Sequence, residues 1–171
     1  MTTEIHGTCL PEFSGVREVF RDNFEKRGEL GAAIAVHEDG ELVVDLWGGF
    51  QDKDRTVSWK RDTVVCMMSV GKAMAALCVH MLIDRGKIAP SRPVAEYWPE
   101  YAANEKGDTT VSTLLAHRAG VVFTEAAPPG ALFDQETMAK ALAEAPPAWP
   151  PGSEHAYHSS TYGILLSELI R

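Results

Sequence analysis

Apolar side chains recur every three or four positions near the start of the chain, with charged residues between them. This spacing gathers the apolar side chains on one face of a helix, so the pattern predicts an amphipathic helix over residues 13–27. The apolar positions are Phe13, Val16, Phe20 and Phe24.

The pattern then changes to two β-prone runs, residues 31–37 and 41–47. Asp39 and Gly40 lie between them, and this pair suits the positive φ angles of a tight hairpin turn. The sequence therefore predicts two antiparallel strands joined by a hairpin.

A long helix is predicted from Ser69 to Arg85, with Gly86 as its stop. Apolar residues surround this helix on nearly every side, which is typical of a buried helix and not of one lying on a surface. It follows a short apolar run, residues 63–68, whose composition is that of a strand.

Shorter helices are predicted farther along the chain. One begins at Thr110 and ends at Gly120, with Thr110 or Ser112 available as its cap. Residues 135–145 form another, followed by a rigid proline-rich stretch (APPAWPPGSE) and a last helix over residues 160–171. The last pattern stops without a glycine or a polar tail, so we expect this sequence to be cut from a longer chain.

Composition restricts the class of protein. The 171 residues suffice for one domain with a core, and 45% apolar with 23% charged residues is ordinary for a globular protein. The net charge of −8 and the lack of a Lys/Arg stripe argue against a nucleic-acid partner. No apolar run is long enough for a bilayer, and the first residues lack the pattern of a secretory signal. We therefore predict a cytoplasmic protein with no membrane partner.

The three cysteines, Cys9, Cys66 and Cys78, are widely spaced and form no CxxC pair. Two of them lie in apolar segments, so the sequence predicts buried, reduced thiols. There is no HExxH motif, no metal-spaced Cys/His cluster and no glycine-rich phosphate loop, and we predict no metal and no cofactor.

Ser69 and Lys72 form the one arrangement that indicates chemistry. Residues three apart share a helix face, so the serine hydroxyl and the lysine amine can meet. The helix N-terminus favours a developing alkoxide, and apolar neighbours lower the pKa of a lysine. The amine can then accept the serine proton, or its charge can stabilise the alkoxide. The alternative is that the SxxK spacing arises by chance and that Lys72 merely extends its amine to solvent from a buried helix.

A second candidate lies in the stretch PPGSEHAYHSSTYG. Its proline-glycine turn presents Tyr157, with Ser159 two positions later. A tyrosine on a constrained loop can act as a general base if a nearby cation lowers its pKa. The alternative is a tyrosine that only packs at a helix entry.

Five motifs occur in a fixed order: SVGK at Ser69–Lys72, LIDRGKI, PVAEYWPEY, LLAHRAG and PPGSEHAYHSSTYG. This ordered set resembles the serine β-lactamase-like hydrolases, and most closely the family VIII carboxylesterases, which are relatives of class C β-lactamases and DD-peptidases. The resemblance extends from about residue 13 to the end of the sequence.

The resemblance implies an α+β fold of the β-lactamase/transpeptidase type, in which an antiparallel sheet is flanked by helices and joined to a helical subdomain. Residues 1–66 would supply the N-terminal helix and the β-hairpin of the sheet domain. Residues 67–171 would form a mostly helical subdomain that carries SxxK and Tyr-x-Ser.

The resemblance also implies roles for individual residues. Ser69 would be the acylated nucleophile, with its backbone N–H as half of an oxyanion hole, and Lys72 its proton partner. Tyr157 would be the general base and later the acid, and Ser159 would bind substrate. His117 would be structural. His155 and His158 flank Tyr157, and as loop histidines they are expected to be solvated or packed and not to take part in the chemistry.

The sequence departs from the family in two respects. The penicillin-recognising members carry Tyr-x-Asn, whereas Ser159 stands at the third position here and lacks the amide that grips a β-lactam side chain. A Lys-Thr-Gly motif is absent, as are the later strands and the C-terminal helix. We therefore expect an incomplete N-terminal part of the fold, with only a two-stranded hairpin, completed by a second polypeptide or by a further segment.

The function predicted from these features is hydrolysis of small carboxylic esters through an acyl-enzyme intermediate. Three alternatives stay open at this point. They are a β-lactamase or amide hydrolase of the same fold, a catalytically inactive binding module, and a helical interaction fragment without a site.

Overall fold

The computed structural model describes residues 3–171, and the chain divides into two compact units. The first unit ends at Cys66, and the second covers Met67–Arg171. The sheet lies in the first unit, and every α-helix except α1 lies in the second.

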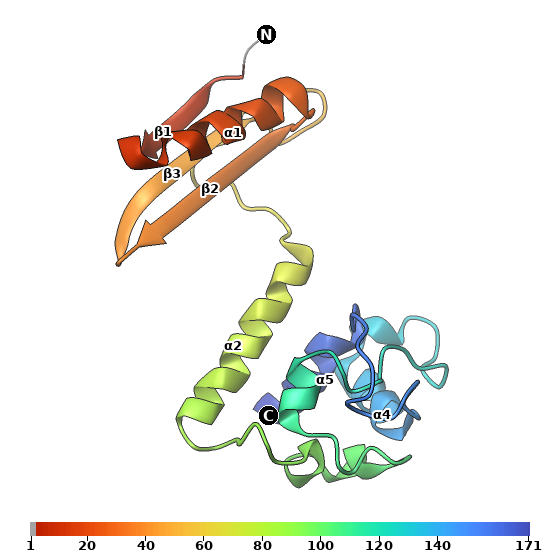
Figure 1. Ribbon diagram of the computed structural model, residues 1–171. Coiled ribbons are helices and arrows are strands. Elements are labelled where there is room, and N and C mark those ends of the chain that lie inside the picture. The colour runs from red at the N-terminus through yellow and green to blue at the C-terminus, as the bar shows by residue number, and fades with distance from the viewer. Residues whose placement is uncertain (1–2) are drawn as a thin grey trace. The chain divides into compact units, whose positions relative to one another are not determined.

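The first unit is a three-stranded antiparallel sheet with one helix packed on it (Figure 1). The strand order is β1-β3-β2. Phe20 of the helix is buried against Val44 and Leu46 of β3, which form the small core of this unit. The elements are β1 (Ile5–Cys9), η1 (Pro11–Phe13), α1 (Ser14–Lys26), β2 (Gly31–Glu38) and β3 (Glu41–Gly49).

The predicted hairpin is confirmed, because β2 pairs antiparallel with β3 and both turn residues, Asp39 and Gly40, have positive φ angles of 50° and 87°. The expectation of only two strands is wrong. Strand β1 also pairs with β3, with Ile5 opposite Gly48. Its pattern gave no signal, because its three middle residues are exposed and Gly7 interrupts it. A Cβ atom on Gly7 would lie 1.9 Å from the Asp45 carbonyl oxygen, so this close backbone approach requires glycine.

The second unit is helical, and α5 runs through its core (Figure 1). Leu165 and Leu166 of α5 are fully buried, together with Val79 of α2 and Leu142 of α4. The elements are η2 (Met68–Val70), α2 (Gly71–Asp84), η3 (Val94–Glu96), η4 (Pro99–Ala102), α3 (Val111–Leu115), η5 (Ala131–Phe133), α4 (Gln135–Glu144) and α5 (Thr161–Ile170).

The predicted long helices are confirmed as α1, α2, α4 and α5. Two other expectations are corrected. The helix capped by Thr110, whose hydroxyl accepts the N–H of Thr113, ends at Leu115 and not at Gly120. It stops because His117 has a left-handed φ angle of 58°, which cannot continue a right-handed helix. The run of residues 63–68 is not a strand, because residues 63–67 have no regular secondary structure and Met68 begins η2.

Helix α2 is not buried as predicted. Only Val79 of this helix is buried, whereas Met74, Leu77 and Met81 are 61%, 53% and 44% exposed. Its composition indicated burial on all sides, but within the second unit only the face toward α5 is covered. The prediction of buried thiols is also wrong, because Cys66 and Cys78 are exposed and Cys9 is partly exposed.

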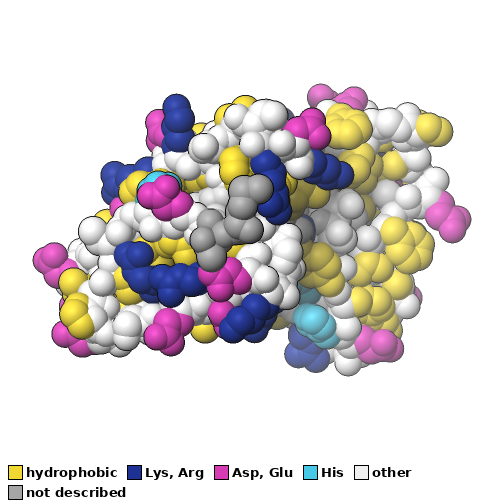
Figure 2. Space-filling view, turned by 90° about the horizontal axis from the view of Figure 1, so that it is seen from above, with side chains coloured by type: hydrophobic (Ala, Val, Ile, Leu, Met, Phe, Trp, Pro, Cys, Tyr) yellow, Lys and Arg dark blue, Asp and Glu magenta, His cyan; other side chains and the backbone are white. Residues whose placement is uncertain are grey.

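In Figure 2, Lys and Arg side chains lie among Asp and Glu side chains on the face shown. In the part of the chain that the structure describes, no helix combines the length and the hydropathy needed to cross a membrane. The cytoplasmic location stays a prediction.

Candidate active site

Ser69 and Lys72 lie at the start of the long helix of the second unit. Ser69 is in the short helix η2, which continues directly into α2, and Lys72 is in the first turn of α2. The Lys72 Nζ atom donates a hydrogen bond to the Ser69 Oγ atom across 3.2 Å. The serine side chain is exposed and the lysine is half-buried, so the hydroxyl is accessible to a ligand.

The residue before the serine has an unusual backbone. Met68 has a φ angle of 47°, in the left-handed region that residues other than glycine rarely adopt. Such a conformation costs about 1–3 kcal/mol and often occurs next to reactive side chains. It turns the chain sharply before Ser69, which is thereby placed at the tip of the turn that begins the helix.

Tyr157, which lies far along the chain from Ser69 and Lys72, contacts Lys72. Its ring lies under the Lys72 Nζ atom, 4.9 Å from the ring centre, in cation–π contact. Hydrogen bonding of the Tyr157 hydroxyl with Ser69, then with Lys72, and the positive charge of Lys72 lower the pKa of this phenol. Ser69, Lys72 and Tyr157 therefore form one cluster within the second unit.

The loop that carries Tyr157 is held by the segment after α3. Ala148 N–H donates to the Gly120 carbonyl across 2.9 Å, and Gly152 N–H donates to the Arg118 carbonyl across 2.9 Å. The Arg118 guanidinium donates back to the Gly152 carbonyl. These bonds fix a proline-rich loop that has no secondary structure of its own.

Ser159 does not join the cluster. Its side chain is exposed, and within residues 3–171 no interaction joins it to Ser69 or Lys72. Its backbone N–H donates to the Tyr157 carbonyl across 2.9 Å and tightens the turn after the tyrosine. Its role as a substrate-binding residue stays a prediction.

The neighbouring histidines differ in environment. His158 is fully buried, and its Nδ1 atom lies 2.7 Å from the Ala156 carbonyl oxygen. His155 is exposed. His117, which the sequence indicated only as structural, contacts the Tyr157 ring at 5.2 Å between ring centres. No sequence signal marked this contact, because the pattern predicted a helix that continues through His117 to Gly120.

Comparison with known proteins identifies the family of this chain. The model of the family described as Beta-lactamase matches residues 16–171. The chain belongs to the beta-lactamase family. The resemblance and the fold class inferred from the motifs are thereby confirmed.

Two beta-lactamase-family relatives are named as esterases. Esterase/beta-lactamase LipL of Mycobacterium tuberculosis is 39% identical over 98% of this chain and 39% of its own length. Esterase EstB of Burkholderia gladioli is 27% identical over 81% of this chain and 40% of its own length. The chain thus spans about two fifths of the length of these curated relatives.

Solved structures show the same fold. A family VIII carboxylesterase is 41% identical with a TM-score of 0.92, over 98% of this chain and 46% of that one. A penicillin-binding protein homologue from Caulobacter crescentus is 43% identical with a TM-score of 0.93, over the same shares. The β-lactamase/transpeptidase-like fold expected from the motifs is therefore the fold of this beta-lactamase-family chain.

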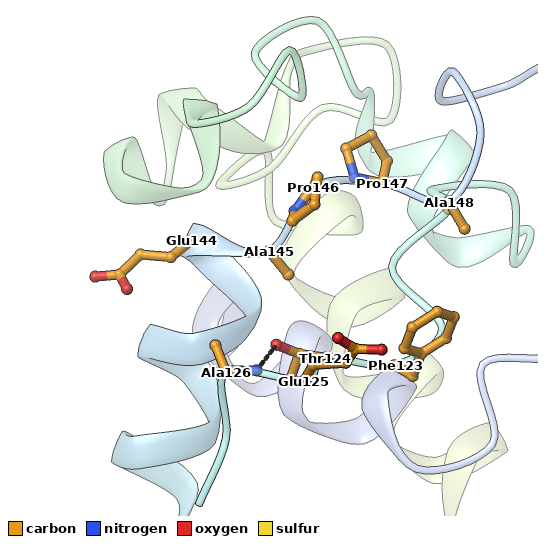
Figure 3. Close-up of a pocket in the computed structure, with 10 residues that line it drawn as sticks. Phe123, Thr124, Glu125, Ala126, Glu144, Ala145, Pro146, Pro147 and Ala148 are labelled. Carbon is orange, nitrogen blue, oxygen red and sulfur yellow. Dashed lines mark hydrogen bonds between the residues drawn. The ribbon is translucent and has the colours of Figure 1, made fainter.

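A separate cavity of about 370 Å³ lies in the second unit (Figure 3). Segments 123–126 and 144–148 form its walls, with the Phe123 ring and the two adjacent prolines, Pro146 and Pro147, around it. The residues that line it include none of Ser69, Lys72 and Tyr157. Among residues 3–171, no three His, Cys, Asp or Glu side chains gather in a way that could hold a metal ion.

Proposed function

We propose that this chain supplies the nucleophile of a serine hydrolase that cleaves carboxylic esters through an acyl-enzyme intermediate. The observation that carries the proposal is the cluster in which Lys72 Nζ lies 3.2 Å from Ser69 Oγ and above the Tyr157 ring. Relatives named as esterases support the choice of substrate class.

The reaction follows from the three groups. Ser69 Oγ attacks the ester carbonyl carbon and gives its proton to the Tyr157 phenolate, whose charge Lys72 stabilises. The tetrahedral intermediate collapses, and the alcohol leaves with the proton from Tyr157. Water then loses a proton to Tyr157 and attacks the acyl carbon, and the carboxylic acid leaves as Ser69 regains its proton.

The developing oxyanion needs hydrogen-bond donors. The backbone N–H of Ser69 supplies one of them at the positive end of the helix. We propose that the second donor belongs to a segment outside this sequence. The apolar side chains of α2 that are exposed within the second unit support a further segment, because a face of this kind is ordinarily covered in a complete fold.

This requirement can be tested by complementation. The chain is expressed alone and together with the part of the family VIII carboxylesterase that lies beyond the region of similarity. We expect ester hydrolysis only in the combined sample. Full activity of the chain alone would show that no further segment is needed.

A β-lactamase activity is the second candidate, since one relative carries both names, Esterase/beta-lactamase. Ser159 favours the ester because it lacks the amide found at this position in penicillin-recognising enzymes. Turnover of p-nitrophenyl butyrate is compared with turnover of nitrocefin. Nitrocefin hydrolysis faster than ester hydrolysis would overturn the proposed preference.

Labelling by a fluorophosphonate probe separates an enzyme from an inactive binding module. We expect mass spectrometry to locate the label on Ser69 and to find none in the Ser69→Ala variant. A folded, complemented sample that stays unlabelled would contradict the proposed nucleophile.

A further inference from the structure

We propose that His117 is a positioning residue that holds Tyr157 in place through both of its chain neighbours, and that it must be neutral to do so. This inference rests on the proposed function in one respect, because Tyr157 is its catalytic target. The structural part of the inference stands independently and can be tested without activity.

His117 accepts hydrogen bonds from the residues on both sides of Tyr157. The His117 carbonyl oxygen accepts the N–H of Ala156 across 3.3 Å, and its Nδ1 atom accepts the N–H of His158 across 3.0 Å. Ala156 and His158 are the residues before and after Tyr157. One residue on a different segment therefore fixes the backbone on both sides of the proposed general base.

The imidazole ring is itself held firmly. It stacks on the Tyr162 ring, with 4.1 Å between ring centres and 19° between planes. Tyr162 is buried in α5, and its hydroxyl donates to the Leu115 carbonyl oxygen across 3.0 Å. The imidazole also contacts the Tyr157 ring, with 5.2 Å between ring centres. The imidazole therefore connects α5, through Tyr162, to the loop that carries Tyr157.

The hydrogen bond from the His158 N–H to Nδ1 requires that the His117 imidazole be neutral. Since Nδ1 accepts an N–H, its lone pair must be free, and the proton of the neutral ring is on Nε2. Protonation makes both nitrogens donors, removes the bond to His158 and adds a positive charge. Burial, then the nearby His158, His155 and Lys72, lower the pKa of His117 and so favour the neutral form.

The groups that face the imidazole are Lys72 of α2, Tyr162 of α5, and His155, Tyr157 and His158 of the loop. None of these is a carboxylate that would stabilise the charged ring. Since the pKa is lowered, the neutral ring prevails from neutral pH upward, and the bond to His158 is lost as pH falls through that pKa.

Two substitutions separate the hydrogen bond from the backbone conformation. In His117→Asn, the side-chain oxygen is separated from Cα by the same number of covalent bonds as Nδ1 and can accept the same hydrogen bond. Asparagine also tolerates the left-handed φ angle of 58°. His117→Gly also tolerates that angle but offers no acceptor. His155→Asn is the matched control, because it removes an adjacent imidazole that is exposed.

In the complemented sample, we expect His117→Gly to lower kcat about 100-fold with little change in KM, since a small misplacement of a catalytic group has that effect. His117→Asn should lose less than about tenfold. It should also lack the fall in kcat that protonation of His117 adds, at low pH, to the fall caused by protonation of the Tyr157 phenolate. His155→Asn should retain that fall. Equal losses in the Gly and Asn variants, or an unchanged acid limb in His117→Asn, would overturn the inference.

Nitrogen-15 NMR of the wild-type protein gives a readout without catalysis. We expect His117 to be neutral at pH 7 with its proton on Nε2, and the amide signal of His158 to move as His117 titrates. A proton on Nδ1 at pH 7 would overturn the inference even in an active enzyme. If the protein hydrolyses no ester but shows the expected tautomer, the proposed function fails and the positioning role stands.

Discussion

The Lys72 Nζ atom donates a hydrogen bond to the hydroxyl of Ser69, three residues earlier, with 3.2 Å between Nζ and Oγ. This relationship is local, because a spacing of three residues places both side chains on one face of the helix. Its chemical value depends on Tyr157, which approaches Lys72 from a loop 85 positions later in the chain.

Removal of the Lys72 charge is expected to slow acylation of Ser69. Lys72→Met should lower the rate of fluorophosphonate labelling about 100-fold or more, because the group that activates the hydroxyl is lost. Lys72→Arg should recover part of the rate, since the guanidinium keeps a positive charge above the Tyr157 ring although it accepts no proton. The rate is followed by mass spectrometry.

Lys87→Met, which removes an exposed lysine of the same unit, serves as the control and should label at the wild-type rate. If Lys72→Arg proves no better than Lys72→Met, the positive charge is not what activates Ser69. Proton transfer to the amine would then replace it as the explanation.

Tyr157 is expected to ionise before the buried tyrosines. Hydrogen bonds with Ser69 and Lys72 and the Lys72 charge lower its pKa, whereas burial raises the pKa of Tyr101 and of Tyr162. As pH rises, the tyrosinate absorbance should show a first step that is absent in Tyr157→Phe. If the phenolate is the general base, kcat/KM should rise with pH through the same step.

The Lys72→Met variant provides the second half of this test. Without the lysine, the pKa of Tyr157 should return toward the ordinary value of a phenol, near 10, so the first step should move to higher pH. A step that stays in place after the substitution would show that Lys72 does not interact with the phenol.

The sequence predicted most where interactions are local. Ser69 with Lys72 follows from helix geometry, and the turn at Asp39 and Gly40 follows from backbone preference. The composition of α2 predicted burial on all sides, whereas Met74, Leu77 and Met81 are exposed within the second unit. Burial depends on which neighbours pack against a helix and not on its composition alone. The contacts of His117 also escaped prediction, since they join residues 41 positions apart through a backbone conformation that no pattern marks.

Gly120 is expected to tolerate no side chain. It has a φ angle of 78°, and a Cβ atom would lie 2.7 Å from the Trp149 carbonyl oxygen, in the loop that leads to Tyr157. Gly120→Ala should lower the free energy of unfolding by at least about 1 kcal/mol. It should also slow labelling of Ser69 if the loop is displaced. Both effects are measured on the purified protein, by urea titration and by the fluorophosphonate probe.

Gly163→Ala is the matched control. Gly163 lies inside α5 with nothing within 4 Å of an added Cβ atom, so alanine should raise the free energy of unfolding by about 0.5–1 kcal/mol. If both substitutions changed stability in the same direction, the positive φ angle of Gly120 and its close approach to Trp149 would not explain the loss.

Lys106 is expected to stabilise the second unit through hydrogen bonds and not through an ion pair. It is fully buried, and its Nζ atom donates to the carbonyl oxygens of Ala103, Ala143 and Ala145 at 2.7, 2.9 and 2.6 Å. These bonds hold the end of α4 where the chain turns into the loop that carries Tyr157. Lys106→Met should lower the free energy of unfolding by about 3 kcal/mol, because buried carbonyl groups lose their donor.

The pH dependence of this loss distinguishes burial from other causes. Burial lowers the pKa of Lys106, so between that value and the ordinary 10.5 the unfolded chain binds more protons than the folded one. The stability of the wild-type protein should therefore rise with pH in this range relative to Lys106→Met. Lys140→Met, on the exposed side of α4, should change neither stability nor its pH dependence. A difference between wild type and Lys106→Met that is constant over this range would show that Lys106 is not penalised by burial.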